Sequence, residues 1–539
     1  MSDGGAEDRA GHRAIRAIQG RAALCIGVPE REPPPGWQWV RLDEVARLES
    51  GHTPSREHPE YWGGDVGWVG IRDAREHHGG VIFNTSQSIT EAGVANSSAR
   101  LLPANTVCLS RTASVGYVVV LGRAMATSQD FVDWVCGPAL EPRFLQSLLM
   151  AEGDEIRRFG KGSTHTTIYF EAAQEFRVCL PPVAEQRRIV AKLDELRDRS
   201  RRAQEAFAEI PALLGRYRQV LLAAAFRGDL TADWRAQHPD VEPASALLTR
   251  ICAERRRRWE DAELARLRAK GRAPTDDRWR VRYEEPAQPD PARLAPLPNG
   301  WVWTSIETVG DVHLGQQRAP QYQTGRYTRP YLRVANIKDD RIDFSDLNEM
   351  DFEPGEFEHY ELRPGDILLS EGQSPELVGQ SAIYEGGVEG LCFQKTLHRF
   401  RRHGSAPSVR FAQLLFRHYV RSGVFRLVAS LTVNIAHLTL VRLKPLEFPL
   451  PPAAEQHEIE RRVAQAMAKI DSIAARAADM VKLSRTLDEQ LLARAFRGEL
   501  VPQNPSDEPA SVTLERIRAQ RAEGDGVATK RGRRAKGAR

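Results

Sequence analysis

Two long segments of the chain repeat each other, and this repeat constrains the fold more than any other feature. The sequence LPPVAEQ at residues 180–186 returns as LPPAAEQ at 450–456, and LLAAAFRGDL at 221–230 returns as LLARAFRGEL at 491–500. Both pairs are 270 residues apart (450 − 180 and 491 − 221), so the segments between them align without a gap. A period this long indicates a duplicated domain, because the repeats of solenoids are about 20–50 residues long.

Shorter similarities extend the repeat on both sides. GWQW at residues 36–39 corresponds to GWVW at 300–303, and EPAS at 242–245 corresponds to EPAS at 508–511. These offsets are 264 (300 − 36) and 266 (508 − 242), so the differences in length fall in the variable stretch and in the linker. Each half is therefore expected to contain a globular domain followed by a long helical segment.

The long segment of each half has the hydrophobic pattern of a coiled-coil helix, with seam residues spaced alternately four and three apart. The polar exceptions are Ser200 and Ser484. We expect helices over 184–228 and 454–498, with a kink at Pro211. Two such stripes at matching positions favour pairing with each other, and the alternative is two unrelated helices that each pack on their own domain. The predicted seam consists of Ile189, Leu193, Leu196, Ser200, Ala203, Phe207, Ile210, Leu214, Tyr217, Leu221 and Ala224, and of Ile459, Val463, Ala466, Ile470, Ile473, Ala477, Met480, Ser484, Leu487 and Leu491.

The variable stretches have the pattern of mixed α/β or α+β domains. Short apolar runs broken by glycine and proline predict strands at 107–110, 118–121, 366–370 and 440–450. Longer amphipathic patterns predict helices around residues 144–149 and 411–416.

The amino-acid composition says little about binding partners but more about the cellular compartment of the protein. The net charge of +4 does not by itself indicate a nucleic-acid-binding protein, although residues 250–282 carry twelve basic and six acidic side chains. The six cysteines form no CxxC pair, which argues against a zinc knuckle or a disulfide framework. The chain has no apolar run long enough to cross a membrane, and its first residues do not resemble a signal peptide. We therefore expect a cytoplasmic protein without a membrane association.

Compact catalytic motifs are absent from the sequence. The chain contains no adenine-methyltransferase motif of the NPPY type, no phosphate-binding P-loop, no HExxH and no GxSxG. His77 and His78 are compatible with a metal pair, but a solvated loop is the more ordinary interpretation. We expect no catalytic residue and no metal site in this chain.

Polar loops that follow the predicted strands are the candidates for binding DNA. Hydroxyl groups, lysines and backbone N–H groups of such loops suit phosphate contacts, and glutamine and arginine read adenine and guanine edges. A polar turn on the protein surface is the alternative for each residue. The candidates are Arg111, Thr112, Gln129, Lys161, Ser163, Thr164 and His165 in the first half, and Lys338, Gln373, Ser374, Gln394, Lys395 and Asn434 in the second.

The motifs together resemble a known family. A GWxW entry, LPPxAEQ at the head of a long helix and AFRGxL at its end, all present twice, make the chain similar to the specificity subunit of type I restriction–modification systems. The resemblance covers about residues 33–522. LPPxAEQ alone is moderately specific, whereas its duplication with a heptad helix after each copy is strongly so.

The resemblance implies an α/β (α+β) fold with an internal duplication and pseudo-two-fold symmetry. Two target-recognition domains, residues 33–183 and 296–453, would be joined by a long antiparallel two-helix coiled coil. The remaining parts would be a flexible N-terminal extension at 1–32, a linker with a basic helix at 229–295, and a C-terminal helix with a basic tail at 499–539.

The resemblance also implies the function. Each domain would read one half of a bipartite, asymmetric double-stranded DNA target, and the helices would set the spacing and dock two adenine-methyltransferase (modification) subunits. Restriction and translocase subunits would complete the complex. S-adenosylmethionine, ATP and Mg²⁺ would bind the partner subunits, and this chain would bind no cofactor. The residues expected in the coiled coil and in partner docking are Glu185, Gln186, Ile189, Leu193, Leu196, Phe226, Glu455, Gln456, Ile459, Val463 and Phe496.

Two other classes of function compete with this interpretation. A stand-alone DNA-binding endonuclease would need a nuclease segment, and about 32 residues before the first domain are too few to hold one. A coiled-coil adaptor would use the helices without binding DNA. Neighbouring genes for an adenine methyltransferase and a helicase-nuclease would favour the specificity subunit.

Overall fold

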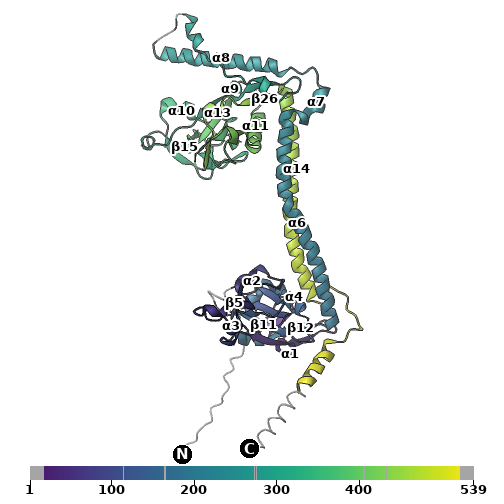
Figure 1. Ribbon diagram of the computed structural model, residues 1–539. Helices are drawn as coiled ribbons and strands as arrows, with labels where there is room; N and C mark the ends of the chain where they lie inside the picture. The colour runs from purple at the N-terminus through teal and green to yellow at the C-terminus, as the bar shows by residue number, and fades with distance from the viewer. Residues whose placement is uncertain are drawn as a thin grey trace, which may run out of the picture. The chain divides into compact units, whose positions relative to one another are not determined.

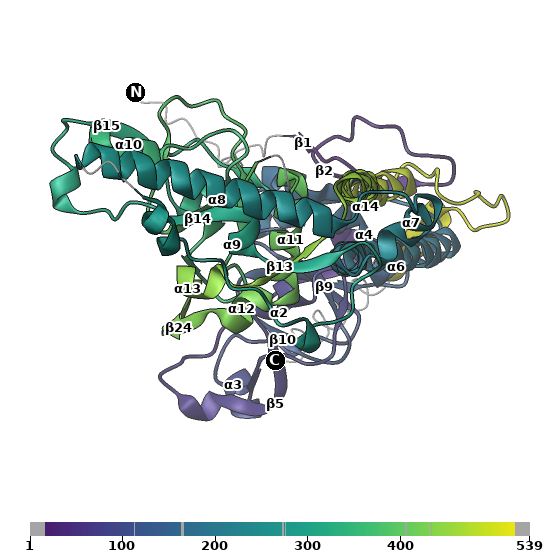
Figure 2. The same cartoon turned by 90° about the horizontal axis from the view of Figure 1, so that it is seen from above.

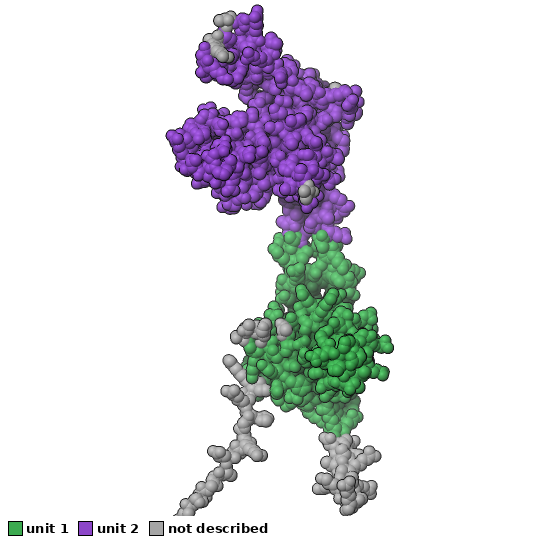
Figure 3. Space-filling view, turned by 60° about the vertical axis from the view of Figure 1, so that its left-hand side comes forward, with its two compact units in different colours: residues 1–208, 478–539 green, residues 209–477 purple. Residues whose placement is uncertain are grey.

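The computed structural model describes residues 17–112, 114–162, 166–271, 274, 276–404, 407–432 and 434–522. The chain divides into two compact units, unit 1 (residues 1–208 and 478–539) and unit 2 (residues 209–477) (Figure 3). Two long helices, α6 (Val183–Arg227) and α14 (Ala453–Ala495), contribute to both units. Their bounds lie within a few residues of those predicted, and α6 continues through Pro211 as one helix.

The core of unit 1 is a five-stranded sheet in the order β4-β11-β8-β9-β6. Its central strands alternate between two cores, because Val107 and Leu109 contact one cluster whereas Cys108 contacts another. Burial of both faces explains why these strands have continuous apolar sequences. Helix α4 (Pro142–Glu152) packs on β8 and β9. The strands are β4 (Ala46–Ser50), β6 (Val81–Ile82), β8 (Thr106–Ser110), β9 (Val118–Leu121) and β11 (Phe131–Cys136).

A second sheet of unit 1 corrects the expectation of a flexible extension over residues 1–32. Strand β2 (Leu24–Ile26) is buried and pairs with β12 (Phe176–Leu180), and the sheet order is β1-β2-β12-β3. The buried carboxylate of Glu152 accepts hydrogen bonds from the backbone N–H groups of Arg21 (2.5 Å) and Ala22 (3.0 Å), and burial raises its pKa to about 7. Residues 17–28 therefore belong to this domain. The other strands are β1 (Ile18–Gln19) and β3 (Gln38–Arg41).

Unit 2 contains a four-stranded sheet in the order β14-β23-β19-β21, covered by helix α11 (Val409–Ser422). Its antiparallel pairings follow the same chain order as β4-β11-β8-β9 of unit 1. The prediction of a strand over 440–450 is wrong for its first part, where Leu440–Leu443 form helix α13 before strand β26 (Glu447–Leu450). The four strands are β14 (Gly310–Leu314), β19 (Ile367–Ser370), β21 (Ser381–Ile383) and β23 (Leu397–Arg402).

Each unit has a further three-stranded sheet beside the main one. In unit 1 its order is β10-β5-β7, and in unit 2 it is β18-β15-β22. The strands are β5 (Trp62–Val69), β7 (Gln87–Ile89), β10 (Ala126–Thr127), β15 (Thr328–Leu332), β18 (Asn348–Asp351) and β22 (Cys392–Phe393). Short helices connect the strands, among them α1 (Leu42–Val45), α2 (Ile71–Glu76), α3 (Glu91–Ala95), α5 (Phe170–Gln174), α10 (Pro354–Tyr360) and α12 (Val424–Val428).

The LPPxAEQ motif makes matching hydrogen bonds in the two units. In unit 1 the indole Nε1 of Trp37 donates to Glu185 Oε1 (3.1 Å), and Gln186 Oε1 accepts from the backbone N–H of Glu141 (2.8 Å) at the start of α4. In unit 2 Trp301 donates to Glu455 Oε2 (2.8 Å), and Gln456 Oε1 accepts from Ser408 N (2.8 Å) at the start of α11. All four motif side chains are buried, so each one fixes a domain to the first turn of its long helix.

The segment after each long helix packs on the domain of the other half. Phe226, at the end of α6, contacts Phe411 of unit 2 (ring centroids 5.4 Å apart). Beyond it, Ala244 N donates to Gly300 O (2.8 Å). The equivalent contacts in unit 1 are those of Phe496 with Phe144 (5.3 Å) and of Ala510 N with Gly36 O (3.2 Å).

In each unit α6 and α14 run antiparallel. In unit 1 Ser200 Oγ lies 2.8 Å from Ser484 Oγ and donates to Asp488 (3.0 Å), while Gln204 donates to Ser484 (3.1 Å). In unit 2 Arg218 pairs with Asp471 (2.6 Å). The predicted polar exceptions, Ser200 and Ser484, therefore meet directly.

The predicted seam of the second half of α14 is right at Ala477, Ser484 and Leu491 but wrong by one residue at the three positions that alternate with them. Ile473, Met480 and Leu487 are 48%, 43% and 49% exposed, and Tyr217 of α6 is 55% exposed. The residues that follow each of these α14 positions, Ala474, Val481 and Asp488, are half-buried instead. This seam keeps the four–three spacing but places Asp488 in the polar layer with Ser200, where its carboxylate is hydrogen-bonded.

The linker forms helix α7 (Ala232–Gln237) and the longer helix α8 (Ala244–Ala269), which contacts α9 (Ile306–Val309) (Figures 1 and 2). Trp259 of α8 stacks on Trp279 at 6.0 Å. Most arginines of α8 form ion pairs with glutamates one turn away, for example Arg258 with Glu254 (2.9 Å). No helix of the described residues is long and apolar enough to cross a membrane.

We predict that Glu455→Ala destabilises unit 2 by about 3 kcal/mol or more, because Arg235 would lose its partner in a mostly buried ion pair (2.8 Å) and Trp301 and Thr231 would lose their acceptor. Urea unfolding of the full chain measures the change. The matched control is Glu242→Ala, which removes an exposed pair with Arg250 and should leave the midpoint unchanged. Equal midpoints for both variants would contradict the prediction.

Candidate nucleic-acid interface

The polar residues predicted in the first half meet at one end of the main sheet of unit 1. Strands β8 and β11 pair so that Ser110 lies opposite Phe131, which brings the residues after β8 beside those before β11. Arg111 Nε donates to Gln129 O (3.1 Å), and Thr112 Oγ1 donates to Asp130 Oδ1 (2.6 Å). The side chain of Gln129 is exposed. The structure thus brings Arg111, Thr112 and Gln129 together.

The glycine-rich loop predicted to contact phosphates reaches the same place. Lys161 and Thr167 form a two-way backbone bridge (2.9 Å each), and Ile168 N donates to Arg111 O (2.9 Å). The side chain of Lys161 is exposed. Ser163, Thr164 and His165 lie outside the described residues, between the two arms of this bridge.

Unit 2 repeats this arrangement with different side chains. Glu371, the first residue after β19, donates its N–H to Thr396 O (2.9 Å) and accepts at its carbonyl from Leu438 N (2.8 Å). Strands β24 (Ser430–Thr432) and β25 (Ile435–His437) form a hairpin directly before Leu438, and Asn434 is exposed at its turn.

Most of the residues predicted in the second half belong to this cluster. Gln373 lies on β20 (Gly372–Gln373) opposite Ala436 of β25, and its Oε1 accepts from Ser374 N (3.2 Å). Gln394 and the exposed Lys395 precede β23. Lys338 instead lies on β16 (Ile337–Lys338), where its ammonium donates to Ala335 O (2.8 Å), and it stays a separate prediction.

Sequence reasoning missed a further loop at each cluster, the one that follows β4 or β14. His52 N donates to Thr127 O (2.9 Å) in unit 1, and Gln316 N donates to Phe393 O (3.1 Å) in unit 2. Side chains of the loops also contact the cluster in both units. Thr53 donates to Gln129 Oε1 in unit 1, and Lys395 Nζ donates to Gln317 Oε1 (3.5 Å) in unit 2. These loops add Thr53 and Gln317 to the candidate interface.

A glycine before each missed loop was the signal available in the sequence. A Cβ atom on Gly51 would lie 2.2 Å from Thr127 O, and one on Gly315 would lie 2.3 Å from Gln394 O. Neither approach is possible for another residue type, so glycine is required for the loop to lie against the cluster. The two glycines are visible in the sequence, but the contacts that require them are not.

The histidine pair does not form a metal site in the described part of the chain. His78 Nδ1 accepts from the backbone N–H of Val118 (3.1 Å), and burial lowers the pKa of its ring. His77 contacts the carbonyl of Asp73 (3.1 Å). The described residues contain no group of three or more histidine, cysteine, aspartate or glutamate side chains that could hold a metal ion.

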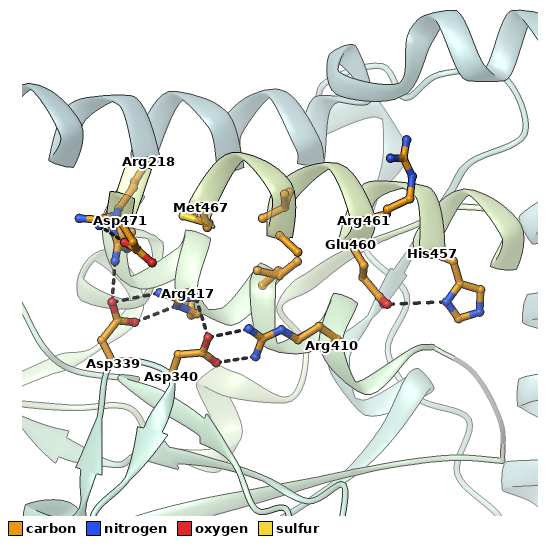
Figure 4. A pocket seen from close by; sticks show the side chains of 14 residues that line it. Arg218, Asp339, Asp340, Arg410, Arg417, His457, Glu460, Arg461, Met467 and Asp471 are labelled. Carbon is orange, nitrogen blue, oxygen red and sulfur yellow. Dashed lines mark hydrogen bonds and ion pairs between the residues drawn. The ribbon is translucent and has the colours of Figure 1, made fainter. Parts of the chain in front are cut away.

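A cavity of about 740 Å³ lies in unit 2 between α11 and α14 (Figure 4). Arg410 and Arg417 of α11 both pair with Asp340, at 2.8 and 2.9 Å, and Arg417 and Arg421 both pair with Asp339, at 2.9 and 2.6 Å. These aspartates lie in the turn between β16 and β17 (Arg341–Ile342). The network therefore fixes this turn to α11, and we assign it a structural role.

The residues predicted to dock partner subunits need a correction. With the exception of the half-buried Leu196, every one of them is 6% exposed or less. They form the contacts between each domain and the long helices within this chain, and a side chain without exposed surface cannot touch another subunit. The buried residues are Glu185, Gln186, Ile189, Leu193, Phe226, Glu455, Gln456, Ile459, Val463 and Phe496.

Exposed apolar side chains lie elsewhere on the two helices. In unit 2, Leu213 and Tyr217 of α6 are 50% and 55% exposed, and in unit 1, Leu483 and Leu487 of α14 are 58% and 49% exposed. The two pairs are 270 residues apart (483 − 213 and 487 − 217), which is the period of the repeat. We call them the α6 and α14 apolar stripes. Contiguous exposed apolar residues are typical of interaction surfaces.

Comparisons with known proteins agree on one family. Residues 34–208 match the model of the type I restriction modification DNA specificity domain. The chain is 26% identical over 404 residues to the type I restriction enzyme EcoDI specificity subunit of Escherichia coli, covering 72% of this chain and 78% of that protein. It is 23% identical over 519 residues to the StySPI specificity subunit of Salmonella potsdam, covering 92% and 98%.

A solved structure shares the fold. The HsdS subunit from Thermoanaerobacter tengcongensis is similar with a TM-score of 0.52 and 20% sequence identity, over 87% of this chain and 99% of that one. The mixed α/β content expected from the sequence is therefore confirmed. The family-model match, the curated relatives and the duplicated motifs all make the chain similar to type I restriction–modification specificity subunits.

Proposed function

We propose that the chain is the subunit that selects the DNA sequence in a type I restriction–modification complex. Each unit contributes one recognition domain, and each domain reads one half of a bipartite, asymmetric target. The observation that carries this proposal is the matching cluster at the end of β8 and of β19, built on the same backbone contacts but from different side chains. Matched scaffolds with different polar groups suit two different half-sites.

The proposal assigns the chemistry to partner subunits. Two adenine-methyltransferase subunits would bind S-adenosylmethionine, and restriction subunits would use ATP and Mg²⁺. The chain itself would be non-catalytic and would act in the cytoplasm on double-stranded DNA. The long helices α6 and α14 would set the spacing between the half-sites. They would do so as one continuous antiparallel coiled coil in a duplicated, pseudo-symmetric chain. The antiparallel contacts within each unit support this arrangement.

The apolar stripes are the surfaces that we propose for docking the two methyltransferase subunits. Each unit carries one stripe at the same position of its repeat, so two copies of one partner can make the same contact. Aromatic and aliphatic residues that are half exposed in the free chain provide apolar area to bury on association.

We expect adenine methylation to follow a gapped motif only when this chain is present. The chain is co-expressed with the methyltransferase encoded beside it in a host without adenine methylation, and methylated adenines are mapped across the genome. Methylation of the same motif without the chain would contradict the proposal. Cleavage of DNA by the purified chain alone would favour the endonuclease, and partner binding without DNA binding would favour the adaptor.

Gln373→Ala should relax one half-site while the other half-site stays unchanged, because Gln373 belongs only to the unit 2 cluster. Loss of a bidentate base contact lowers discrimination by about 1–3 kcal/mol.

Lys395→Ala should instead weaken binding to all sequences and reduce the salt dependence by about one charge. Lys469→Ala, on the exposed surface of α14, is the control for loss of a lysine. Equal effects of Lys395→Ala and Lys469→Ala would exclude the unit 2 cluster as the interface.

The double variant Leu483→Asp, Leu487→Asp should reduce the number of bound methyltransferase subunits from two to one, because a charge would be buried in one of two equivalent contacts. Native mass spectrometry of the purified complex counts the subunits. Lys482→Asp, at an 81% exposed position of the same helix, is the control for a new acidic side chain. Two subunits bound to the double variant would contradict the assignment of the stripe.

A further inference from the structure

The loop after β4 carries an arginine, Arg56, three residues after Thr53 of the unit 1 cluster. This loop spans residues 51–61 and leads into β5. Its beginning is fixed by the bond from His52 N to Thr127 O (2.9 Å) and by Trp68 Nε1, which donates to His52 O (3.0 Å). The side chain of Thr53 then bonds to Gln129. The loop is thus attached at its root to residues of the candidate interface.

The side chain of Arg56 is held in place by an aromatic ring and an amide. Its guanidinium carbon lies 4.5 Å from the ring centroid of Trp62, and its Nη2 donates to Gln87 Oε1 (3.1 Å). Trp62 is itself fixed, because its Nε1 donates to Ser55 O (3.2 Å) and its ring packs edge-on against Trp68 at 5.2 Å. An arginine with few accessible rotamers loses little conformational entropy on binding a ligand.

The charge of Arg56 is available to a ligand. Arg56 and Gln87 are both exposed, and no carboxylate of the described residues forms an ion pair with this guanidinium. Arg47 and Arg100 of the same domain differ in this respect, since both pair with Glu49. A guanidinium has five N–H donors and Gln87 accepts from Nη2 alone, so the remaining donors can bind a planar acceptor.

The corresponding loop of unit 2 is held in another way. Asp351 accepts from the backbone N–H groups of Thr324 (2.6 Å), Gly325 (3.0 Å) and Tyr327 (3.0 Å), and these bonds with the Thr324 hydroxyl lower its pKa to about 2. The two domains thus share the position of the loop but present different side chains from it. A difference of this kind is expected of elements that read different sequences.

We propose that Arg56 is a specificity-determining residue that reads a guanine in the half-site of unit 1, with Gln87 as its positioning residue. This inference rests on the proposed function and deepens it by naming the base. Guanine presents two acceptors, N7 and O6, on its major-groove edge, and a guanidinium donates to both at once. Gln87 accepts only one N–H of the Arg56 guanidinium, so two further N–H groups stay free to donate to guanine. A carboxylate at position 87 would instead neutralise the positive charge of Arg56.

The test measures the methylated motif of the complete complex, with wild-type chain, Arg56→Ala, Arg56→Lys and the control Arg187→Ala. Arg187 is an exposed residue of α6 that pairs with Glu141 and lies outside the loop. We expect Arg56→Ala to turn one guanine of the unit 1 half-site into a degenerate position and to lower the modification rate of the original target about 5- to 150-fold. Arg56→Lys should keep the salt dependence of binding but lose the guanine preference, because lysine lacks the planar fork.

Three results would overturn the inference. An unchanged motif with uniformly weaker binding and a smaller salt dependence would show that Arg56 contacts a phosphate. An unchanged motif with unchanged binding would place Arg56 outside the interface. If Arg56→Ala instead made a base degenerate in the half-site that responds to Gln373→Ala, Arg56 would not act in the half-site of unit 1. Failure of the proposed function is distinguishable from all three, because the wild-type chain would then direct no gapped motif.

Gln87→Ala tests the positioning role separately. The variant keeps the guanidinium on Trp62 but removes its hydrogen-bond acceptor, so the same guanine position should become partly degenerate while the remaining bases stay specified. A purely structural role would instead lower methylation of the whole target without changing its sequence. The base composition at this one position therefore distinguishes the two roles.

Discussion

A buried carboxylate at the head of each long helix is the interaction on which the rest of the structure depends. Glu455 accepts from Trp301, Thr231 and Arg235, which belong to the start of the domain and to the segment after α6. A buried carboxylate is costly unless all its acceptor positions are used, so these segments are held together as a set. Glu185 has the same place in unit 1, where Trp37 donates to it. Every loop of the candidate interface is mounted on a domain fixed in this manner.

The candidate interface shows how one scaffold can serve two different half-sites. Backbone hydrogen bonds and a close-packed glycine fix the positions of the loops in both units, and they are independent of the side chains that the loops carry. Arg111 and Gln129 in unit 1 are replaced by Glu371 and Lys395 in unit 2 at the corresponding strand ends. The polar groups can therefore vary without a change of fold, which is the property that sequence selection requires.

The long helices divide their residues between internal pairing and the outer surface. Ser200, Ser484 and Asp488 form a hydrogen-bonded polar layer between the helices, in which Asp488 Oδ2 accepts from Ser200 while Asp488 Oδ1 is buried without a partner. Leu483 and Leu487 lie on the surface of the same helix, α14. Exposed leucines are unfavourable in an isolated helix pair, and association with a partner removes this penalty.

The sequence by itself determined the repeat, the two long helices and their ends, the central strands β8, β9 and β19, and the resemblance to a known family, because each leaves a local pattern of spacing or a recurring motif. Only the tertiary structure decided which segments meet. The tails after α6 and α14 pack on the domain of the other half, residues 17–28 complete a sheet, and the loops after Gly51 and Gly315 join the interface. These contacts link residues far apart in the chain, and hydrophobic periodicity carries no information about such partners. The three misplaced seam positions of α14, Ile473, Met480 and Leu487, have the same cause, because the residue that follows each of them fits a heptad spacing equally well.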